Sequence, residues 1–364
     1  MRISSLQLYW LLFTMSLGMI LLLTINPAVL YAKQDAWIAI MWPGVFGILI
    51  AYISTRLSLR YPGQTIIEYS QSILGKWLGR LITIPYLLTC YSYLAVILRE
   101  FADFIQITLF EQTPLWVPMS IMVLALMYVT YKGGIEGIAR CAEILAVIII
   151  LSMIIVSGLS IRDWDYHRLL PLYLHKGVTH IISGGLPATA FFGEPAIMVL
   201  TLFSFLKKPK TAVIPVLWAC IIVATITVLV AIGVVAEFGS NVPSRMIYPV
   251  FMLVQYISIL DFIQNTDVLI VIVWIVSIFV KLSIYLFITS YGTTQWLSFP
   301  KYWERMIGPV ALITFIFAMI PRNTASTGVV FVNFAVHYVV PIVMIGIPIL
   351  LLIVGLIRKQ SVRC

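Results

Sequence analysis

Two long apolar segments of this chain carry helix-breaking residues near their middles. The first, residues 8–30, contains Gly18 and then Asn26-Pro27, and the second, residues 182–206, contains Gly193-Glu194-Pro195. A broken membrane helix exposes backbone polar groups, which are tolerated only where they are buried in protein or line a cavity. A pair of interrupted segments at matching places in two halves points to a transporter-type binding site. The sequence therefore predicts a small-solute permease or a receptor built on a permease fold.

The composition indicates a polytopic membrane protein. Apolar residues make up 62% of the 364 residues and charged residues 10%, whereas about a quarter of an average soluble domain is charged. The net charge of +9 comes from basic residues in short loops, which argues against a nucleic-acid partner. The four cysteines lack metal-type spacing and no enzyme motif is present, so we expect no catalytic residues, no metal and no cofactor.

Because a helix needs about 20 apolar residues to cross a bilayer, the sequence predicts an all-α membrane domain over residues 1–364 with about ten spans. Most Lys and Arg lie in the loops on the side of the N-terminus, so both termini are expected to be cytoplasmic. The predicted spans are 8–30, 37–57, 81–107, 115–131, 141–161, 182–206, 212–236, 269–292, 306–320 and 336–357.

The order of the segments predicts an inverted repeat of five plus five spans. An amphipathic segment, residues 62–79, separates the second and third spans, and a similar one, residues 248–263, separates the seventh and eighth. These segments occupy equivalent positions in two halves of opposite orientation. We expect the repeats to cover residues 1–161 and 182–357, with discontinuous helices as the first and sixth spans.

Two charged residues inside spans are the main candidates for a site. A carboxylate at mid-membrane normally faces a bundle interior or a wet cavity, and Gly193 and Pro195 would open the helix around Glu194 so that its backbone could bind a small zwitterion. Glu194 is also a candidate for proton coupling, and its alternative is a structural carboxylate. Lys281, near the centre of the eighth span, needs a partner or water. It could pair with Glu194 or contact a ligand or coupling ion.

The third span carries further candidates. Tyr93 lies near its middle and could give a pocket a hydroxyl and an aromatic wall, or could serve only in packing. Arg99, Glu100 and Asp103 lie in its external third, where Arg99 and Asp103 have the i, i+4 spacing of a helical ion pair. We interpret this cluster as a structural network or outer gate. Gly18 would supply open backbone to a pocket bounded by the first, third, sixth and eighth spans.

Several local patterns, in one consistent order along the chain, together resemble the B subunits of bacterial spore germinant receptors. This GerAB-like spore germination permease family is a branch of the amino acid–polyamine–organocation superfamily. The patterns are Tyr61-Pro62-Gly63-Gln64-Thr65, Gly75-Lys76-Trp77-Leu78-Gly79, Arg99-Glu100-Phe101, Thr113-Pro114-Leu115-Trp116, Gly134-Ile135-Glu136, Leu169-Leu170-Pro171, Phe192-Gly193-Glu194 and the stretch from Trp274 to Lys281.

The resemblance implies a LeuT/APC-like inverted-repeat fold in the spore inner membrane. It also implies a complex with an A subunit and a C-subunit lipoprotein, and recognition of a nutrient, commonly an amino acid, that triggers germination. One stretch departs from the family pattern: Gln264-Asn265-Thr266-Asp267 retains only the last acid of a charged motif. A nutrient receptor is the first hypothesis and a proton-coupled amino acid transporter the alternative, while an ion channel fits least because no repeated polar pore-lining helix is visible.

Overall fold

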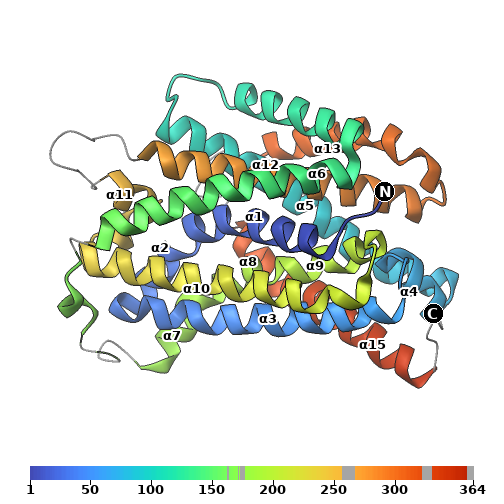
Figure 1. Ribbon diagram of the computed structural model, residues 1–364, viewed down its shortest axis with the longest axis horizontal. Helices are drawn as coiled ribbons and strands as arrows, with labels where there is room; N and C mark the ends of the chain where they lie inside the picture. The colour runs from blue at the N-terminus through green and yellow to red at the C-terminus, as the bar shows by residue number, and fades with distance from the viewer. Residues whose placement is uncertain (162–163, 171, 173–176, 256–266, 322–329, 359–364) are drawn as a thin grey trace.

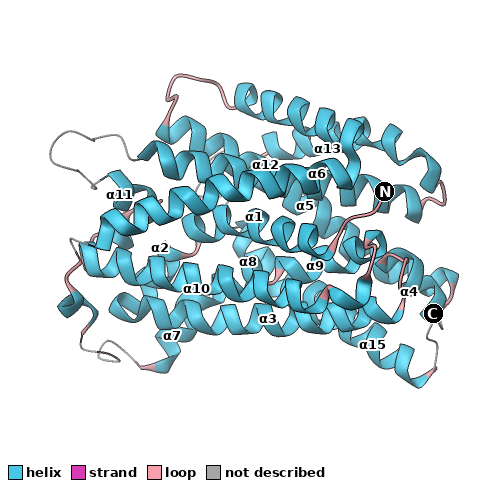
Figure 2. Ribbon diagram, in the orientation of Figure 1, coloured by secondary structure: helices cyan, strands magenta, loops and turns pink. Residues whose placement is uncertain are grey.

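The computed structural model describes residues 1–161, 164–170, 172, 177–255, 267–321 and 330–358. Apart from one bridge between Ile3 and Leu206, every regular element in these ranges is a helix (Figures 1 and 2). The main elements of the first half are α1 (Ser5–Leu23), α2 (Ile25–Ala32), α3 (Ala36–Arg60), α4 (Ile66–Leu74), α5 (Lys76–Thr108) and α6 (Trp116–Ser160).

The second half repeats this succession of long and short helices. Its main elements are α7 (Val178–Gly185), α8 (Thr189–Phe192), α9 (Glu194–Leu202), α10 (Val213–Phe238), α11 (Pro249–Gln255), α12 (Asp267–Trp296), α13 (Trp303–Met319), the π-helical stretch Ala335–Gly346 and α15 (Ile347–Ile357). The short helices α4 and α11 fall within the two predicted amphipathic segments. Residues 256–263 of the second segment, and 264–266 of the departing stretch, lie outside the described residues.

The described part of the chain contains nine helical segments long and apolar enough to cross a membrane. One of them, α6, has 45 residues, about 67 Å at 1.5 Å per residue and twice the thickness of a bilayer core. Its backbone leaves helical geometry at Gly134, where φ is +51°, and its two limbs fold back along each other (Figure 1). The limbs supply the predicted spans 115–131 and 141–161, so the all-α polytopic fold predicted from the sequence is confirmed.

The first span is interrupted, but not at Gly18. The break falls at Thr24, between α1 and α2, because Pro27 has no N–H to donate to the carbonyl of Leu23 four residues earlier. Gly18 lies inside the continuous helix α1, so its backbone belongs to the helical ladder and is not open. The prediction that Gly18 exposes backbone is therefore wrong for this conformation.

The interrupted segments form the centre of the bundle. In the most apolar stretch of Val178–Phe205, 89% of residues are buried, and in that of α1 72% are buried, against 28% in α6. The outer faces of α6, α10 and α13 carry large exposed apolar side chains, as expected for helices that contact lipid. Groups presented by residues 11–22 of α1, by α8 and by α9 are therefore buried among other helices.

The N-terminal residues form a clasp between two distant parts of the chain. The Ile3 N–H donates to the Phe205 carbonyl at 2.8 Å, and the Lys207 N–H donates to the Ile3 carbonyl at 3.0 Å. The Arg2 N–H donates to Oε1 of Glu136 at 2.5 Å. This clasp, residues 1–3, connects the turn of α6 to the end of the interrupted sixth span.

Glu136→Gln is expected to loosen the clasp. The Arg2 N–H bond holds the pKa of the Glu136 carboxyl below its ordinary value of 4.5. Its contribution is therefore complete above pH 4.5 and is lost as the pH falls through the lowered pKa. Because the carboxyl is 44% exposed, the loss is about 1 kcal/mol or less. Hydrogen exchange of Ile3 and Lys207 should be up to about fivefold faster at pH 7, whereas exposed Glu304→Gln should leave it unchanged.

Candidate functional site

Glu194 and Lys281 form an ion pair at the centre of the bundle. Glu194 is the first residue of α9, immediately after the interruption at Gly193, and Lys281 lies in the middle of α12. The Lys281 ammonium nitrogen lies 2.9 Å from Oε1 and 2.7 Å from Oε2 of Glu194. Each side chain is 1% exposed. Of the alternatives that the sequence left open for Lys281, this structure shows direct pairing with Glu194.

The position of Glu194 favours a negative charge. It lies in the first turn of α9, where the positive end of the helix dipole stabilises an anion. Taking each ion out of water still costs several kcal/mol, and the mutual attraction of the pair offsets this cost. The pair therefore links α9 to α12. Each buried charge needs an opposite charge beside it, either from the other side chain or from a bound molecule.

Aromatic side chains surround the pair. The ring of Phe191 in α8 lies 5.9 Å from the Lys281 nitrogen, and the Tyr285 hydroxyl lies near the Glu194 carboxylate. Tyr93 of α5 packs against Tyr285 with ring centroids 5.7 Å apart, and its hydroxyl donates to the Ala190 carbonyl at 3.4 Å. The structure thus brings the predicted residue Tyr93 to the same place as the ion pair.

Phe191 and Tyr285 were not predicted, although a local signal existed for both. Tyr285 follows Lys281 by four residues on α12, so it lies on the same helix face one turn away. Phe191 precedes Glu194 by three residues across the interruption. Their spacing of three or four residues from an intramembrane charge would have been enough to include both residues in the predicted site.

The interruption at Gly193 is confirmed, but its backbone is not open. The Gly193 N–H donates to the Thr189 carbonyl at 3.0 Å, and its carbonyl accepts from the Ala196 N–H at 3.0 Å. Space at Gly193 is tight, because a Cβ atom would lie 2.2 Å from the sulfur of Met344 and 3.0 Å from the Thr189 carbonyl oxygen. Pro195, which lacks an N–H, leaves the Phe191 carbonyl without its helical donor. The sequence-based expectation that Gly193 offers free amides is wrong for this conformation.

Gly18 contributes to the site through close packing. A Cβ atom on Gly18 would lie 2.6 Å from the Cβ of Ser277, and Ser277 precedes Lys281 by one turn of α12. Because no real Cβ contact is this short, only glycine lets α1 approach α12 at this depth. Gly18 therefore determines how closely the helix that carries Lys281 can lie to the first span.

Gly18→Ala is expected to destabilise the protein by about 1–3 kcal/mol, the usual cost of overpacking a tight core. The second change Ser277→Gly removes the opposing Cβ and should recover most of the loss. Gly158→Ala on α6, where no atom lies within 4 Å, is the matched control and should be neutral or mildly stabilising. Thermal unfolding in detergent measures all three, and equal effects of Gly18→Ala and Gly158→Ala would contradict the packing argument.

The cluster predicted near the outer end of α5 is assembled, but it is separate from the ion pair. Arg99 Nε lies 2.9 Å from Asp103 Oδ1, and its Nη1 donates to the carbonyl of Pro321 at 2.6 Å. Arg99, Glu100 and Asp103 are all at least 96% buried. The guanidinium thus ties α5 to the end of α13. A gating role for these residues stays a prediction.

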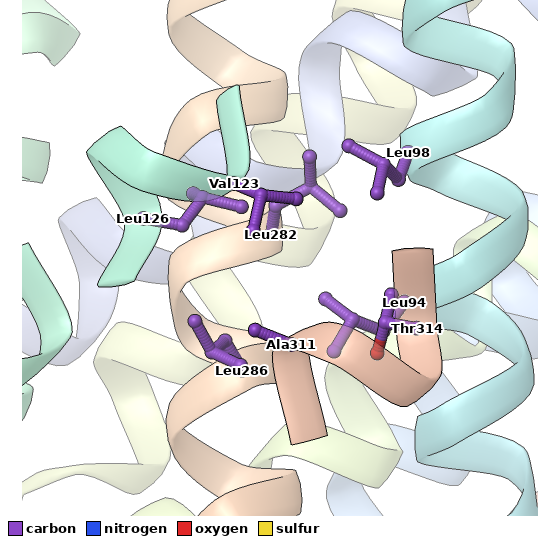
Figure 3. Close-up of a pocket in the computed structure, with 8 residues that line it drawn as sticks. All are labelled: Leu94, Leu98, Val123, Leu126, Leu282, Leu286, Ala311 and Thr314. Atoms are coloured by element: carbon purple, nitrogen blue, oxygen red, sulfur yellow. The ribbon is translucent and has the colours of Figure 1, made fainter. Parts of the chain in front are cut away.

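One small cavity near α12 does not belong to the site. It lies between α5, α6, α12 and α13, has a volume of about 10 Å³, and is lined by apolar side chains and Thr314 (Figure 3). The Thr314 hydroxyl already donates to the Val310 carbonyl at 2.8 Å. The cavity has room for about one water molecule and offers no charge, so the candidate site remains the Glu194–Lys281 pair with its aromatic surroundings.

Comparison with known proteins identifies relatives of the chain. Residues 2–327 match a family model described as "Spore germination protein". The spore germination protein YndE of Bacillus subtilis is 26% identical over 90% of this chain and 89% of its own length. The spore germination protein KB of the same species is 28% identical over 80% of this chain and 78% of its own.

Solved transporter structures share the fold. The structure of MhsT in complex with L-phenylalanine is similar with a TM-score of 0.64 and 14% identity, over 98% of this chain and 89% of that one. The nucleobase-cation-symport-1 family transporter MHP1 is similar with a TM-score of 0.62 and 14% identity, over 92% of this chain and 75% of that one. At this identity the likeness establishes the fold of the chain, which is that of LeuT-type transporters.

Proposed function

The chain belongs to the spore germination protein family, and we propose that it is the membrane subunit of a receptor that binds a nutrient amino acid and triggers germination. The observation that carries this proposal is the Glu194–Lys281 ion pair, which lies fully buried at the interruption of the sixth span. An intramembrane pair of this kind marks a functional site by default.

The balanced charges of the pair favour a ligand with no net charge. A zwitterionic amino acid can insert between the two side chains, with its ammonium group on Glu194 and its carboxylate on Lys281. One ion pair is then replaced by two, and no buried charge is left without a partner. A ligand that carried only a positive charge would instead leave the buried Lys281 ammonium without a counter-charge. Phe191 and Tyr93 supply an aromatic wall for the ligand side chain.

Ligand insertion changes the distance between α9 and α12, and this change in the bundle is the signal that passes to the partner subunits. In the free arrangement Glu194 faces Lys281, and in the bound arrangement each faces the ligand. Because the ligand binds the second arrangement more tightly than the first, it increases the population of the second. The partners that receive the change are an A subunit and a C-subunit lipoprotein. We place the complex in the spore inner membrane, with both termini on the cytoplasmic side. The N-terminus and the end of α15 lie at one end of the bundle (Figure 1), in agreement with this orientation.

A proton-coupled amino acid transporter is the second candidate. Its support is the likeness to solved transporters, one of them in complex with L-phenylalanine. Fold alone does not decide between transport and sensing. Uptake of an amino acid by the purified protein in liposomes, driven by a proton gradient, would favour the transporter. Saturable binding without uptake would favour the receptor.

The deciding experiment compares spores that lack the gene with wild-type spores on a panel of single nutrients, and measures amino acid uptake by growing cells in parallel. We expect the mutant spores to lose their response to one class of amino acid with uptake unchanged. Normal germination together with reduced uptake would overturn the receptor in favour of the transporter. Where a related receptor compensates, the comparison is made in a strain that lacks it.

A further inference from the structure

A second candidate site lies at the end of the bundle that carries the N-terminus and the end of α15, where Figure 1 shows α4. A cleft of about 520 Å³ opens between α4, the first turn of α5 and the end of α12. It is about fifty times larger than the apolar cavity of Figure 3. One wall consists of residues from the segment 61–79, which contains two of the patterns that resemble the family. These residues take no part in the Glu194–Lys281 site.

The sequence builds this wall as a rigid corner. Thr65 and Glu68 form a capping box that starts α4, and Gly75, with φ of +90°, ends it. Gly79 then lets α5 lie directly on α4, because a Cβ atom there would be 2.5 Å from the backbone of Gln71. The Ser70 hydroxyl donates to the Gly79 carbonyl at 3.1 Å and fixes the corner. The shape of this wall is therefore set before any ligand arrives.

A buried hydrogen-bond donor lines the cleft. Gln295, at the end of α12, is 6% exposed. Its carbonyl oxygen accepts from the Thr65 hydroxyl at 2.6 Å, which orients the amide, and its Nε2 has no hydrogen-bond partner among the described residues. Buried polar groups are nearly always hydrogen-bonded, so this amide indicates an acceptor that comes from another molecule.

One basic side chain in the cleft and a second beside it can attract an anion. Lys76 lines it with an exposed side chain, and Arg80 Nη2 donates to the hydroxyl of Ser298, another lining residue. Among the described residues that line the cleft, Glu68 is the one acid, and its carboxylate already accepts from the Thr65 N–H at 2.9 Å. The cleft thus combines an ammonium with the side chain of Gln295, and the oxygens of a phosphate group accept hydrogen bonds from both kinds of donor.

The residues that follow Lys76 are of the kind expected at a membrane surface. Trp77, Leu78 and Leu81, directly after Lys76, are 84%, 61% and 63% exposed, and tryptophan beside exposed apolar residues marks a membrane–water interface. Basic pockets between helices at this depth bind lipid headgroups. We propose that the cleft formed by Lys76, Gln295 and Ser298 binds the phosphate group of an anionic phospholipid.

Native mass spectrometry of the full-length protein in detergent tests this site. The protein is mixed with equal concentrations of phosphatidylglycerol and phosphatidylcholine, and the amount of each lipid that it retains is measured. Wild type should retain phosphatidylglycerol at least about tenfold better than phosphatidylcholine. Lys76→Gln removes the ammonium, and Gln295→Glu keeps the acceptor for Thr65 but replaces the amide donor by an anion. Each should reduce retention of phosphatidylglycerol by about tenfold or more, whereas Lys132→Gln, an exposed lysine on α6, should not.

Three results would overturn the proposal. Equal retention of the two lipids would show that the headgroup is not recognised. Unchanged retention in both variants would place the lipid elsewhere on the protein. Glycerol phosphate binding as tightly as the intact lipid would identify a soluble phosphate ester as the ligand instead. None of these measurements depends on nutrient binding, so the site can stand or fall independently of the proposed receptor function.

Discussion

Lys281→Met is expected to destabilise the protein by about 3–5 kcal/mol and to abolish the nutrient response. The change leaves the Glu194 carboxylate 1% exposed without its partner, and removing one member of a buried pair carries this cost. Thermal unfolding of the purified protein measures the first effect. The nutrient concentration that gives half-maximal germination measures the second.

The double variant Glu194→Gln/Lys281→Met separates stability from binding. It removes both charges with little change in volume, and replacing a whole buried pair by neutral groups is often close to neutral for stability. We therefore expect unfolding near that of the wild type. The half-maximal nutrient concentration should still rise about 100-fold or more, because two charge-assisted contacts of at least about 1.5 kcal/mol each are lost.

Two further variants complete the comparison. Glu194→Gln alone should reduce the response without removing the protein from the membrane. Lys301→Met changes an exposed lysine near the end of α12 and should alter neither stability nor response. A double variant that is stable and responds like the wild type would show that the pair serves only the structure, and the ligand would then have to bind elsewhere.

The sequence was most informative where a constraint acts within one helix. Apolar runs identified the spans, and the cost of an intramembrane charge singled out Glu194 and Lys281. The sequence left open whether Lys281 pairs with Glu194, 87 residues earlier, or contacts a ligand or coupling ion. The predicted symmetry placed both residues around a common cavity but gave no distance between them. The sequence named both Gly18 and Asn26-Pro27 in the first interrupted span, and only the role given to Gly18 was wrong. The break lies at Thr24, because the missing N–H of Pro27 frees the carbonyl four residues earlier.

Contacts between distant segments could not be predicted in this way. Gly18 is confined by Ser277, and Gly193 by Met344, so both glycines look in the sequence like flexible points although they are sites of dense packing. The cleft beside α4 combines Lys76 with Gln295 from opposite halves of the chain. Only the three-dimensional arrangement shows that these two side chains face one space.

Arg99→Met is expected to have the second large effect, a destabilisation of about 3–5 kcal/mol. Arg99 and Asp103 are 4% and 2% exposed as a pair, so loss of the guanidinium leaves a buried carboxylate without its main counter-charge. The change also removes the hydrogen bond to the Pro321 carbonyl, which ties α5 to the end of α13. Tryptophan fluorescence during thermal unfolding in detergent measures the loss.

The chain provides a matched control for this argument. Arg168 and Asp165 form a pair of the same two residue types that is 44% and 46% exposed, and exposed pairs contribute about 0–1 kcal/mol. Arg168→Met should therefore cost far less than Arg99→Met, although both remove an arginine from an aspartate on the same helical turn. Arg99→Lys, which keeps the charge but has no planar fork to hold carboxylate and carbonyl together, should fall between them. Similar losses for the buried and the exposed arginine would mean that burial does not determine the strength of the Arg99–Asp103 pair. The conclusion that Arg99 ties α5 to the end of α13 would then have to be abandoned.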